Sequence, residues 1–533
     1  MGDEPSVGLS FTVEVDAPSD LAFDATRADA LITVKALAAG GTRPVPAAEI
    51  LIMDRSLSMA GRGKLDEAKR AMCAAVDALR DGTRLAIIAG NHTARVVYPP
   101  TGTLAGIDAG TRAAAKLQIA RQLPEGGTAI GSWLTLAGQV FETLPDSGTV
   151  RHAVLYTDGK DEHETPEELG TALAACSDRF VCDARGLGDD WNYAELLRIT
   201  EALHGTAEAV VTISDLTGDF TRLIRQARRI VLPRVYLGLR LNDRFRLDSV
   251  RQTRPVDAGL TGSQRQSDGE LHVPLGAWSP ETRQYEVSLS FDAESLPVDE
   301  DLRAARITLH AERPDGTRQP CAGTMAMVVR RRSTPGFETM RPSELTRVES
   351  RRELGMAMRA CADAWDEGDL ARADRELRLA VEVAESLQDT ARLRVLRAVA
   401  ETGPDGRPRL RRTASRGEMQ RLGLESTRTA APRVDPVGPW GPVGAGERGE
   451  WGDHPAADGT PQRRCPRCGA TTAARLLRHC EACGYGFDDA GEGAGEGAAA
   501  GGARGPAGGP ADGLAEGPAA DPVRSADGPV DAS

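Results

Sequence analysis

Several features are missing from this sequence of 533 residues. No apolar run reaches the length that a helix needs to cross a bilayer, and residues 1–15 lack the basic start and apolar stretch of a secretion signal. A G-x-x-x-x-G-K-S/T phosphate loop is also missing, and the eight histidines form no Ser/His/Asp order. These absences predict a cytoplasmic protein that has no membrane attachment and is not an enzyme.

The sequence has fewer basic than acidic residues. Asp and Glu number 78 against 65 Lys and Arg, which gives a net charge of −13. A chain with this excess of negative charge is not attracted as a whole to the phosphates of nucleic acid or of anionic lipid. Hydrophobic residues, at 40%, are sufficient for several folded cores. The composition therefore predicts a multidomain protein and argues against nucleic acid as a partner.

Polar residues are present where predicted buried strands end. The apolar run 49–53 leads into the sequence Asp-Arg-Ser-Leu-Ser, the run 153–156 leads to a second Asp-Gly, and residues 126–128 are Gly-Gly-Thr in a predicted loop. The carboxyl ends of parallel strands open onto the ligand crevice of an α/β fold, and hydroxyl and carboxylate oxygens there suit Mg²⁺. The candidate ligands are Asp54, Ser56, Ser58, Thr128 and Asp158.

These residues resemble the metal-ion-dependent adhesion site (MIDAS) of the von Willebrand factor A (vWA) family, a D-x-S-x-S triad joined by a distant Thr and Asp. The resemblance implies that Ser56, Ser58 and Thr128 contact Mg²⁺ or Mn²⁺ directly. Asp54 and Asp158 would act through water or hydroxyl hydrogen bonds. An Asp or Glu side chain of a partner protein would then take the remaining coordination position.

Two other interpretations of this motif remain open. D-x-S-x-S alone can be a helix cap, in which Ser56 or Ser58 accepts hydrogen bonds from amides of the following helix. A bound Mg²⁺ can also activate water for hydrolysis, for which Asp161, Glu162 and Glu164 offer the only nearby general base. We expect these three acids to form a solvated surface instead.

Residues 46–231 alternate predicted strands and helices. Short apolar runs such as 84–88 and 152–156 are separated by amphipathic segments such as 63–79. This alternation predicts a doubly wound, mostly parallel sheet covered by helices on both faces. It is the Rossmann-like α/β fold that the vWA resemblance also implies.

The flanking segments have other patterns. Residues 232–333 contain short alternating strands separated by Asp, Gly and Pro turns, which predict a β-sandwich. Residues 1–45 contain further strand-like segments, so we expect the vWA domain to be inserted into that sandwich. Residues 340–402 contain amphipathic segments that predict a small helical hairpin.

Four of the nine cysteines form two C-x-x-C pairs within residues 461–488. This spacing predicts a zinc ribbon with a closed tetrahedral Zn²⁺ site. Two redox pairs or an iron–sulfur cluster are the alternatives, but the surrounding βαβ unit or cluster-type spacing is missing. Nearby arginines favour nucleic-acid binding by the ribbon, and the scarcity of aromatic residues argues against it. The predicted zinc ligands are Cys465, Cys468, Cys480 and Cys483.

Two segments have the composition of disordered chain. Residues 403–460 are rich in Pro, Gly and Arg, and residues 489–533 consist almost wholly of Gly, Ala, Pro and acids. Within the predicted linker, phosphorylation would create a docking site for a phosphothreonine reader. The candidate phosphorylation sites are Thr413, Ser415, Thr427 and Thr429.

Together these patterns predict a bacterial, Mg²⁺-dependent scaffold or adaptor that binds an acidic residue of a partner protein. Stress response or kinase/phosphatase signalling is the expected setting. The alternatives are an adaptor of an AAA+ ATPase and a protein that binds nucleic acid through its zinc ribbon.

Overall fold

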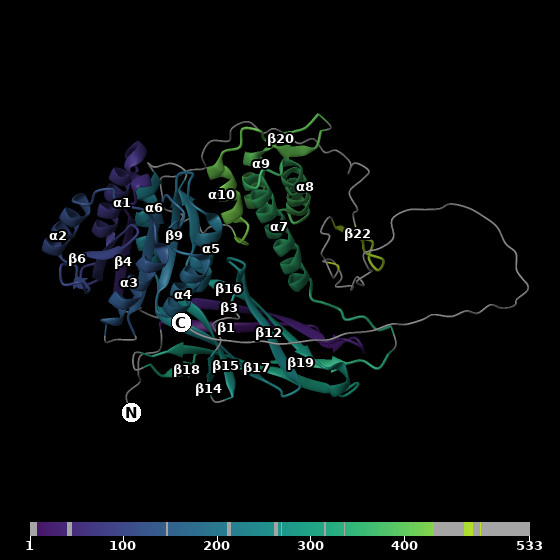
Figure 1. The fold of residues 1–533 in the computed structure, drawn as a ribbon. Helices are drawn as coiled ribbons and strands as arrows, with labels where there is room; N and C mark the ends of the chain where they lie inside the picture. The colour runs from purple at the N-terminus through teal and green to yellow at the C-terminus, as the bar shows by residue number, and fades with distance from the viewer. Residues whose placement is uncertain are drawn as a thin grey trace, which may run out of the picture. The chain divides into compact units, whose positions relative to one another are not determined.

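The computed structural model divides into two units, residues 1–488 and residues 489–533. All residues that the structure describes lie in the first unit (Figure 1). The described residues are 8–39, 45–144, 148–210, 215–260, 265–267, 269–313, 316–334, 336–404, 406–430, 463–472 and 480.

The first architectural element is a mixed sheet with the strand order β10-β9-β8-β4-β5-β6, in which β7 also pairs with β5. Neighbouring strands from β10 to β5 pair in parallel, whereas β6 and β7 run antiparallel to β5. The prediction of a mostly parallel sheet is therefore confirmed. The strands are β4 (Ala47–Asp54), β5 (Arg84–Gly90), β6 (Ala94–Tyr98), β7 (Ala105–Gly106), β8 (Val150–Thr157), β9 (Val181–Leu187) and β10 (Ala207–Val210).

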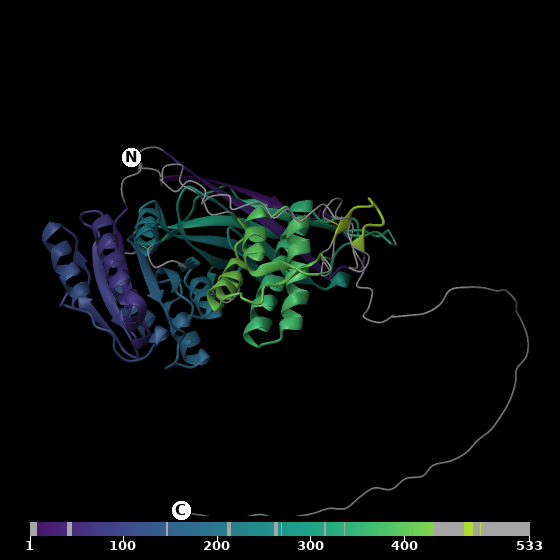
Figure 2. The ribbon, with the colours of Figure 1, turned by 90° about the horizontal axis from the view of Figure 1, so that it is seen from above.

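Helices cover both faces of this sheet, as Figures 1 and 2 show. Ile50 and Ile52 of β4 share a core with α3, α4 and α5, whereas Leu51 and Met53 share a core with α1, α2 and α6. Successive side chains of a strand point to opposite faces, so a continuous apolar run fills both cores. The helices are α1 (Lys64–Ala78), α2 (Ala109–Ala120), α3 (Ile130–Glu142), α4 (Pro166–Cys176), α5 (Tyr193–Ala202) and α6 (Leu216–Ala227).

Two further sheets contain the strands before and after this α/β domain. Their strand orders are β1-β3-β16-β12-β13 and β14-β15-β11-β17-β19-β2, with β18 also paired to β17. Strand β3 pairs with β16, so chain segments on both sides of the α/β domain meet in one sheet. Apolar side chains of both sheets, such as Ile32, Val287, Leu237 and Leu309, form one shared core.

The bounds of these strands are as follows. The first sheet contains β1 (Leu9–Asp16), β3 (Arg27–Ala38), β12 (Phe245–Arg254), β13 (Ala258–Gly259) and β16 (Thr282–Phe291). The second contains β2 (Asp20–Leu21), β11 (Leu232–Leu241), β14 (Arg265–Ser267), β15 (Glu270–Trp278), β17 (Asp301–Glu312), β18 (Arg318–Pro320) and β19 (Met325–Arg331).

A helical region follows these sheets. It packs on the α/β domain, because Leu354 and Leu377 belong to the same core as Ile50 of β4. A short two-stranded sheet connects its last two helices. The elements are α7 (Ser343–Asp366), α8 (Leu370–Ser386), α9 (Thr390–Val399), β20 (Ala400–Thr402), β21 (Pro408–Leu410) and α10 (Arg416–Glu425).

The prediction that residues 403–460 form a disordered linker is wrong for the segment that ends in α10. Ser415 and Glu418 form a capping box at the start of this helix, and its apolar residues Met419 and Leu422 are buried. The Pro-rich and Gly-rich composition of the surrounding sequence does not indicate this helix, because its stability depends on tertiary packing. Residues 431–462 and the predicted tail 489–533 lie outside the described residues.

At the C-terminal end of the described residues, β22 (Arg463–Arg464) pairs with β23 (Thr471–Thr472) around Cys465 and Cys468. No helix of the described residues is long and apolar enough to cross a membrane.

Candidate metal centre

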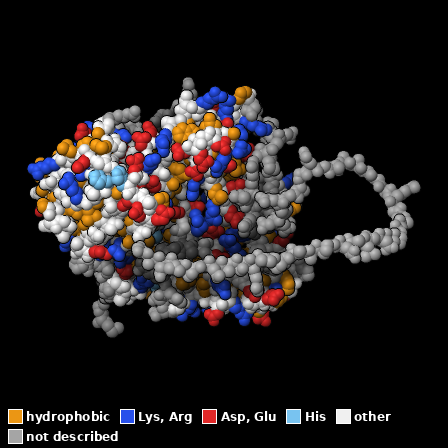
Figure 3. All heavy atoms as spheres, in the orientation of Figure 1, with side chains coloured by type: hydrophobic (Ala, Val, Ile, Leu, Met, Phe, Trp, Pro, Cys, Tyr) orange, Lys and Arg blue, Asp and Glu red, His pale blue; other side chains and the backbone are white. Residues whose placement is uncertain are grey.

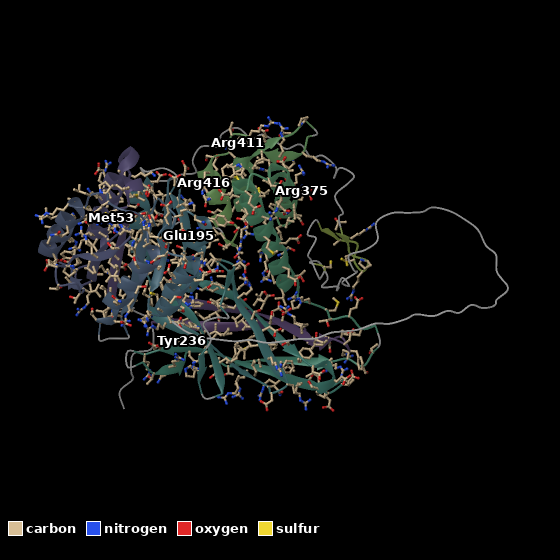
Figure 4. All side chains as sticks on the ribbon, in the orientation of Figure 1. Met53, Glu195, Tyr236, Arg375, Arg411 and Arg416 are labelled. Carbon is tan, nitrogen blue, oxygen red and sulfur yellow. The ribbon has the colours of Figure 1, made fainter. Side chains whose placement is uncertain are left out.

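Asp54 is the last residue of β4, the strand with neighbours on both sides in the middle of the α/β sheet. It directly follows Met53, which is labelled in Figure 4. Its side chain is fully buried, and both carboxylate oxygens accept hydrogen bonds. Ser56 N donates to Asp54 Oδ1 over 2.8 Å, and Thr157 Oγ1 donates to Asp54 Oδ2 over 2.7 Å. These two bonds fix the carboxylate beneath the loop that begins at Arg55.

The two serines of the motif point to one another and to the next strand. Ser56 Oγ lies 2.8 Å from Ser58 Oγ, and Ser58 Oγ donates to Asp158 Oδ1 over 2.6 Å. Ser56 precedes the short 3-10 helix Leu57–Gly63 and makes no side-chain capping bond to any described residue. The helix-cap interpretation is therefore wrong for Ser56, whose hydroxyl belongs to a polar cluster.

Thr128 is brought to this cluster by bonds between two loops. Leu57 N donates to Gly126 O over 2.9 Å, and Arg55 Nη1 donates to Glu125 Oε2 over 2.8 Å. A Cβ built on Gly159 would lie 3.5 Å from Thr128 Oγ1 and 3.6 Å from Ser58 Oγ. Both hydroxyls therefore border the space above Gly159, next to Asp158.

The acids after Asp158 do not form the solvated surface that we expect from the sequence. Asp161 Oδ2 accepts from Ile130 N over 3.0 Å, and Glu164 accepts from the amides of Gly131 and Ser132. Two carboxylates thus cap α3, which begins just after Thr128. The solvated-surface prediction is wrong for these two acids, because free amides at the helix start attract them; Glu162 is exposed.

The electrostatics of the two carboxylates, Asp54 and Asp158, are set by their burial and by the positive charge of one lysine, Lys64. Burial, only partly offset by the hydrogen bonds from Ser56 and Thr157, raises the pKa of the Asp54 carboxyl to about 6. Lys64 Nζ lies 2.5 Å from Asp158 Oδ2, so the second carboxylate has an ion-pair partner. Lys64 and Thr157 lie outside the sequence motif and were not predicted to belong to the site. The only sequence feature that pointed to Lys64 was its position at the start of the predicted helix 63–79.

This donor set fits a small hard cation. Neighbouring ligands of an octahedral Mg²⁺ with bonds of about 2.1 Å lie about 3.0 Å apart. The 2.8 Å between the two serine hydroxyls is close to that separation. The uncharged hydroxyls would contact such a cation directly. The carboxylate of Asp158 orients Ser58, and that of Asp54 accepts a hydrogen bond from Thr157. The structure therefore brings all five predicted metal-site residues together.

Comparison with known proteins identifies the family. The von Willebrand factor type A domain model matches residues 50–160. The solved structure of a von Willebrand factor type A protein from Catenulispora acidiphila is 30% identical, with a TM-score of 0.73, and the match covers 81% of this chain and 99% of that one. The chain belongs to the von Willebrand factor type A family.

Two other proteins are similar to this vWA protein. An uncharacterized protein from Synechocystis sp. is 29% identical over 249 residues, which are 46% of this chain and 57% of that relative. The ArnB paralog VWA2 from Sulfolobus acidocaldarius is 12% identical with a TM-score of 0.49, and the match covers 79% of this chain and 98% of that one.

A second candidate metal centre of this vWA protein lies near its C-terminal end. Potential ligand atoms of Cys465, Cys468 and Cys480 all lie within 4.8 Å of one another, and the Sγ atoms of Cys468 and Cys480 are 3.5 Å apart. Burial raises the pKa of the Cys465 thiol, but hydrogen bonds from backbone amides of Cys468 and Arg467 outweigh it and lower the pKa to about 7. Cys483, the fourth predicted ligand, lies outside the described residues.

The predicted phosphorylation sites differ in accessibility. Thr413 and Ser415 are exposed, and the Ser415 hydroxyl caps α10. Thr427 and Thr429 are only 8% and 9% exposed, and Thr429 Oγ1 donates to Thr253 O over 2.5 Å. The prediction that these two threonines lie in a disordered linker is wrong, because the segment after α10 packs against β12.

Proposed function

We propose that this vWA protein is a scaffold or adaptor that captures an acidic side chain of a partner protein through a Mg²⁺ or Mn²⁺ ion at a MIDAS. The observation that carries the proposal is the convergence of three hydroxyls from two separate segments in front of two buried carboxylates. Ser56 and Ser58 come from the loop after β4, and Thr128 comes from the loop before α3. Ser56, Ser58 and Thr128 would hold the ion. The ion would supply a Lewis-acidic position for a carboxylate.

The charges around the site support an anionic ligand. Asp54 and Asp158 contribute two negative charges when ionised, and Lys64 neutralises one of them through its pair with Asp158. A bound dication would leave one net positive charge among these groups. Because this charge lies in a buried environment, its attraction for a carboxylate of the partner is only weakly screened.

Other features support binding rather than hydrolysis. A hydrolytic mechanism needs a general base beside the metal. Asp161 and Glu164 hold the amides at the start of α3, which removes two of the three candidates from that role. We therefore propose that the site binds its partner without chemistry.

Magnesium titration calorimetry of the full chain tests the metal site. Thr128→Val keeps the size of the side chain and removes the hydroxyl, and we expect it to weaken Mg²⁺ affinity at least about tenfold. Thr135→Val is the matched control, because among the described residues Thr135 Oγ1 bonds only its own helix, at Gly131 O. Equal Mg²⁺ affinity for wild type and Thr128→Val would contradict the proposal.

We further propose that the three clustered cysteines, together with Cys483, bind Zn²⁺ as a zinc ribbon that tethers a second partner. Their spacing supports this, since thiolates around Zn²⁺ lie about 3.8 Å apart for bonds of about 2.3 Å. Replacement of Cys465 and Cys468 by Ser should remove one zinc ion per chain in elemental analysis. Unchanged zinc content would argue for another role of the pair.

We infer that the two largely antiparallel sheets with a shared core form a β-sandwich, into which the vWA domain is inserted. We also propose that the protein acts in the bacterial cytoplasm in stress or kinase/phosphatase signalling. An adaptor of an AAA+ ATPase is the alternative. Acidic and basic side chains are mixed over the face in Figure 3, which supports protein rather than nucleic acid as the partner. A pull-down that is lost with Asp54→Ala and kept after deletion of residues 461–488 would favour capture by the vWA domain.

A further inference from the structure

A cluster of two histidines and one glutamate lies on the sheet that contains β15, β11 and β17. Along β11 and β17, Leu237 and Leu309 belong to the core shared with the other antiparallel sheet. Side chains alternate along a strand, so Gly238 and His310 face the opposite side. His272 of β15 pairs directly with Gly238, which places it on the same face.

Gly238 provides the space for this cluster. A Cβ built on Gly238 would lie 2.3 Å from Glu270 Oε1 and 2.8 Å from His310 Nε2, closer than a side-chain carbon can approach. Strand β11 lies between β15 and β17 in the sheet. Side chains from the two outer strands therefore meet above the glycine of the middle strand, and only glycine at that position allows the contact.

The distances match a metal site. His272 Nε2 lies 3.4 Å from Glu270 Oε2, and His310 Nε2 lies 3.5 Å from Glu270 Oε1. Potential ligand atoms of all three residues lie within 4.8 Å of one another. Ligands around a tetrahedral Zn²⁺ with bonds of about 2.0–2.1 Å are separated by about 3.4 Å.

Both histidines are buried, and one has an unused nitrogen. His272 is 6% exposed and His310 is 9% exposed. His310 Nε2 is buried and accepts or donates no hydrogen bond within the part of the chain that the structure describes. A buried ring nitrogen without a hydrogen bond is costly, and a metal ion would satisfy it.

Arg318 occupies one side of the cluster. Its Nη1 lies 2.6 Å from His272 Nδ1, and its guanidinium stacks 4.0 Å above the ring of Tyr236, which Figure 4 labels. A guanidinium only donates, so His272 Nδ1 accepts and the neutral ring carries its proton on Nε2. For Nε2 to bind a metal, that proton must move to Nδ1 and Arg318 must turn away. Arg318 is thus a competitor of the ion.

We propose that Glu270, His272 and His310 bind a divalent transition-metal ion, Zn²⁺ before others, which joins β15 to β17 across Gly238. Two imidazoles and a carboxylate favour Zn²⁺ over Mg²⁺, whose preferred ligands are oxygens only. This site differs in donor type from the hydroxyl cluster of the vWA domain and from the cysteine cluster. The proposal is therefore independent of the proposed function, and the two can fail separately.

The test is the Zn²⁺ content and affinity of the full chain carrying Cys465→Ser and Cys468→Ser, measured by elemental analysis and by competition with a chromogenic chelator. In this background we expect one bound Zn²⁺ that His310→Gln weakens at least about tenfold. His204→Gln is the matched control, because His204 also lies 3.4 Å from a carboxylate, that of Asp178, but outside the cluster. It should leave Zn²⁺ binding unchanged.

Two further variants make the result decisive if His310→Gln unfolds. Arg318→Gln removes the competing cation without removing a ligand, and it should raise Zn²⁺ affinity. Glu270→Gln should lower Zn²⁺ affinity while circular dichroism stays that of the parent. Equal Zn²⁺ affinity in the parent, His310→Gln and Glu270→Gln would overturn the proposal, and equal affinity in Arg318→Gln would overturn the competition by Arg318.

Discussion

Lys64 and Asp158 form a buried ion pair at the candidate metal centre, with Lys64 Nζ 2.5 Å from Asp158 Oδ2. The other oxygen of Asp158 accepts the hydrogen bond from Ser58 Oγ. The lysine therefore holds the carboxylate that orients one of the proposed metal ligands. It also places a positive charge beside the proposed position of a dication, so the two cations oppose each other.

This opposition leads to the first prediction. In Lys64→Met, the Asp158 carboxylate remains buried without its partner, and the metal-free protein should lose about 3 kcal/mol of unfolding free energy. Added Mg²⁺ should then stabilise the variant more than it stabilises wild type, because the repulsion is gone. Differential scanning calorimetry with and without Mg²⁺ measures both effects. Lys69→Met on the same helix is the control, and an equal Mg²⁺ effect in Lys64→Met and wild type would contradict the argument.

The second prediction concerns a buried triad near the starts of β4, β8 and β9, at the other end of these strands from the candidate metal centre. His152 Nδ1 lies 2.7 Å from Glu49 Oε2, and His152 Nε2 lies 2.9 Å from Asp183 Oδ2. Burial by itself would lower the pKa of His152, but Glu49 and Asp183 outweigh it and raise the pKa to about 10. The imidazole is therefore charged in the folded protein throughout the neutral range.

The sign of the pH dependence follows from this shift. The pKa of His152 in the folded protein exceeds its unfolded value of about 6.5. The stabilisation of the folded state by the charged imidazole is therefore complete below pH 6.5 and is lost as pH rises toward 10. His152→Gln should be less stable than wild type at pH 6, by about 3 kcal/mol, and the difference should shrink with rising pH. Urea unfolding from pH 6 to 10 measures it, with the exposed His92→Gln as the control. A constant difference across this range would be incompatible with a charged His152.

Four residues of the metal motif, Asp54, Ser56, Ser58 and Asp158, could be predicted from the sequence because they lie at or just after the end of a strand, and Thr128 because it lies in a Gly-Gly-Thr loop. Asp54 and Asp158 follow continuous apolar runs, and strands of one parallel sheet bring such positions to one edge. Lys64 could not be predicted, since the partner of a lysine depends on how α1 packs against the loop after β8. The cap of α3 by Glu164 depends in the same way on tertiary contacts.

The segment that includes α10 shows why composition alone misleads. Gly417 and Gly423 suggest a flexible chain, yet both lie in α10 and are buried. Glycine is used there because neighbouring groups leave no room for a side chain: a Cβ on Gly423 would lie 2.6 Å from the ring of Tyr193. Sequence reasoning recognises a glycine-rich segment but not the surface against which it packs.

That close approach supplies the third prediction. Gly423→Ala should force α10 away from α5, where Gln420 Oε1 accepts from Tyr193 N over 2.7 Å, and should cost about 1–3 kcal/mol. Hydrogen exchange of residues 416–430 should increase, while the exchange of β4 stays unchanged. Gly218→Ala on α6 is the control, because a Cβ there meets nothing within 4 Å. Unchanged exchange in Gly423→Ala would mean that α10 does not pack on Tyr193.

The last prediction concerns Glu164, which caps α3 next to Thr128. Burial, together with the hydrogen bond to Asp161, raises the pKa of the Glu164 carboxyl to about 7. The folded pKa is above the unfolded value, so the stabilisation from its protonated form is complete below the unfolded pKa of about 4.3 and is lost as pH rises to about 7.

Glu164→Gln resembles the protonated side chain at every pH and should remove this part of the pH dependence. The unfolding free energy of wild type, relative to that of the variant, should therefore decrease between pH 4.5 and pH 7. Guanidinium unfolding at several pH values measures the difference. Glu162→Gln, which changes an exposed acid of the same loop, serves as the control. A relative stability of wild type that increases with pH would mean that the α3 amides favour the charged carboxylate more strongly than burial opposes it.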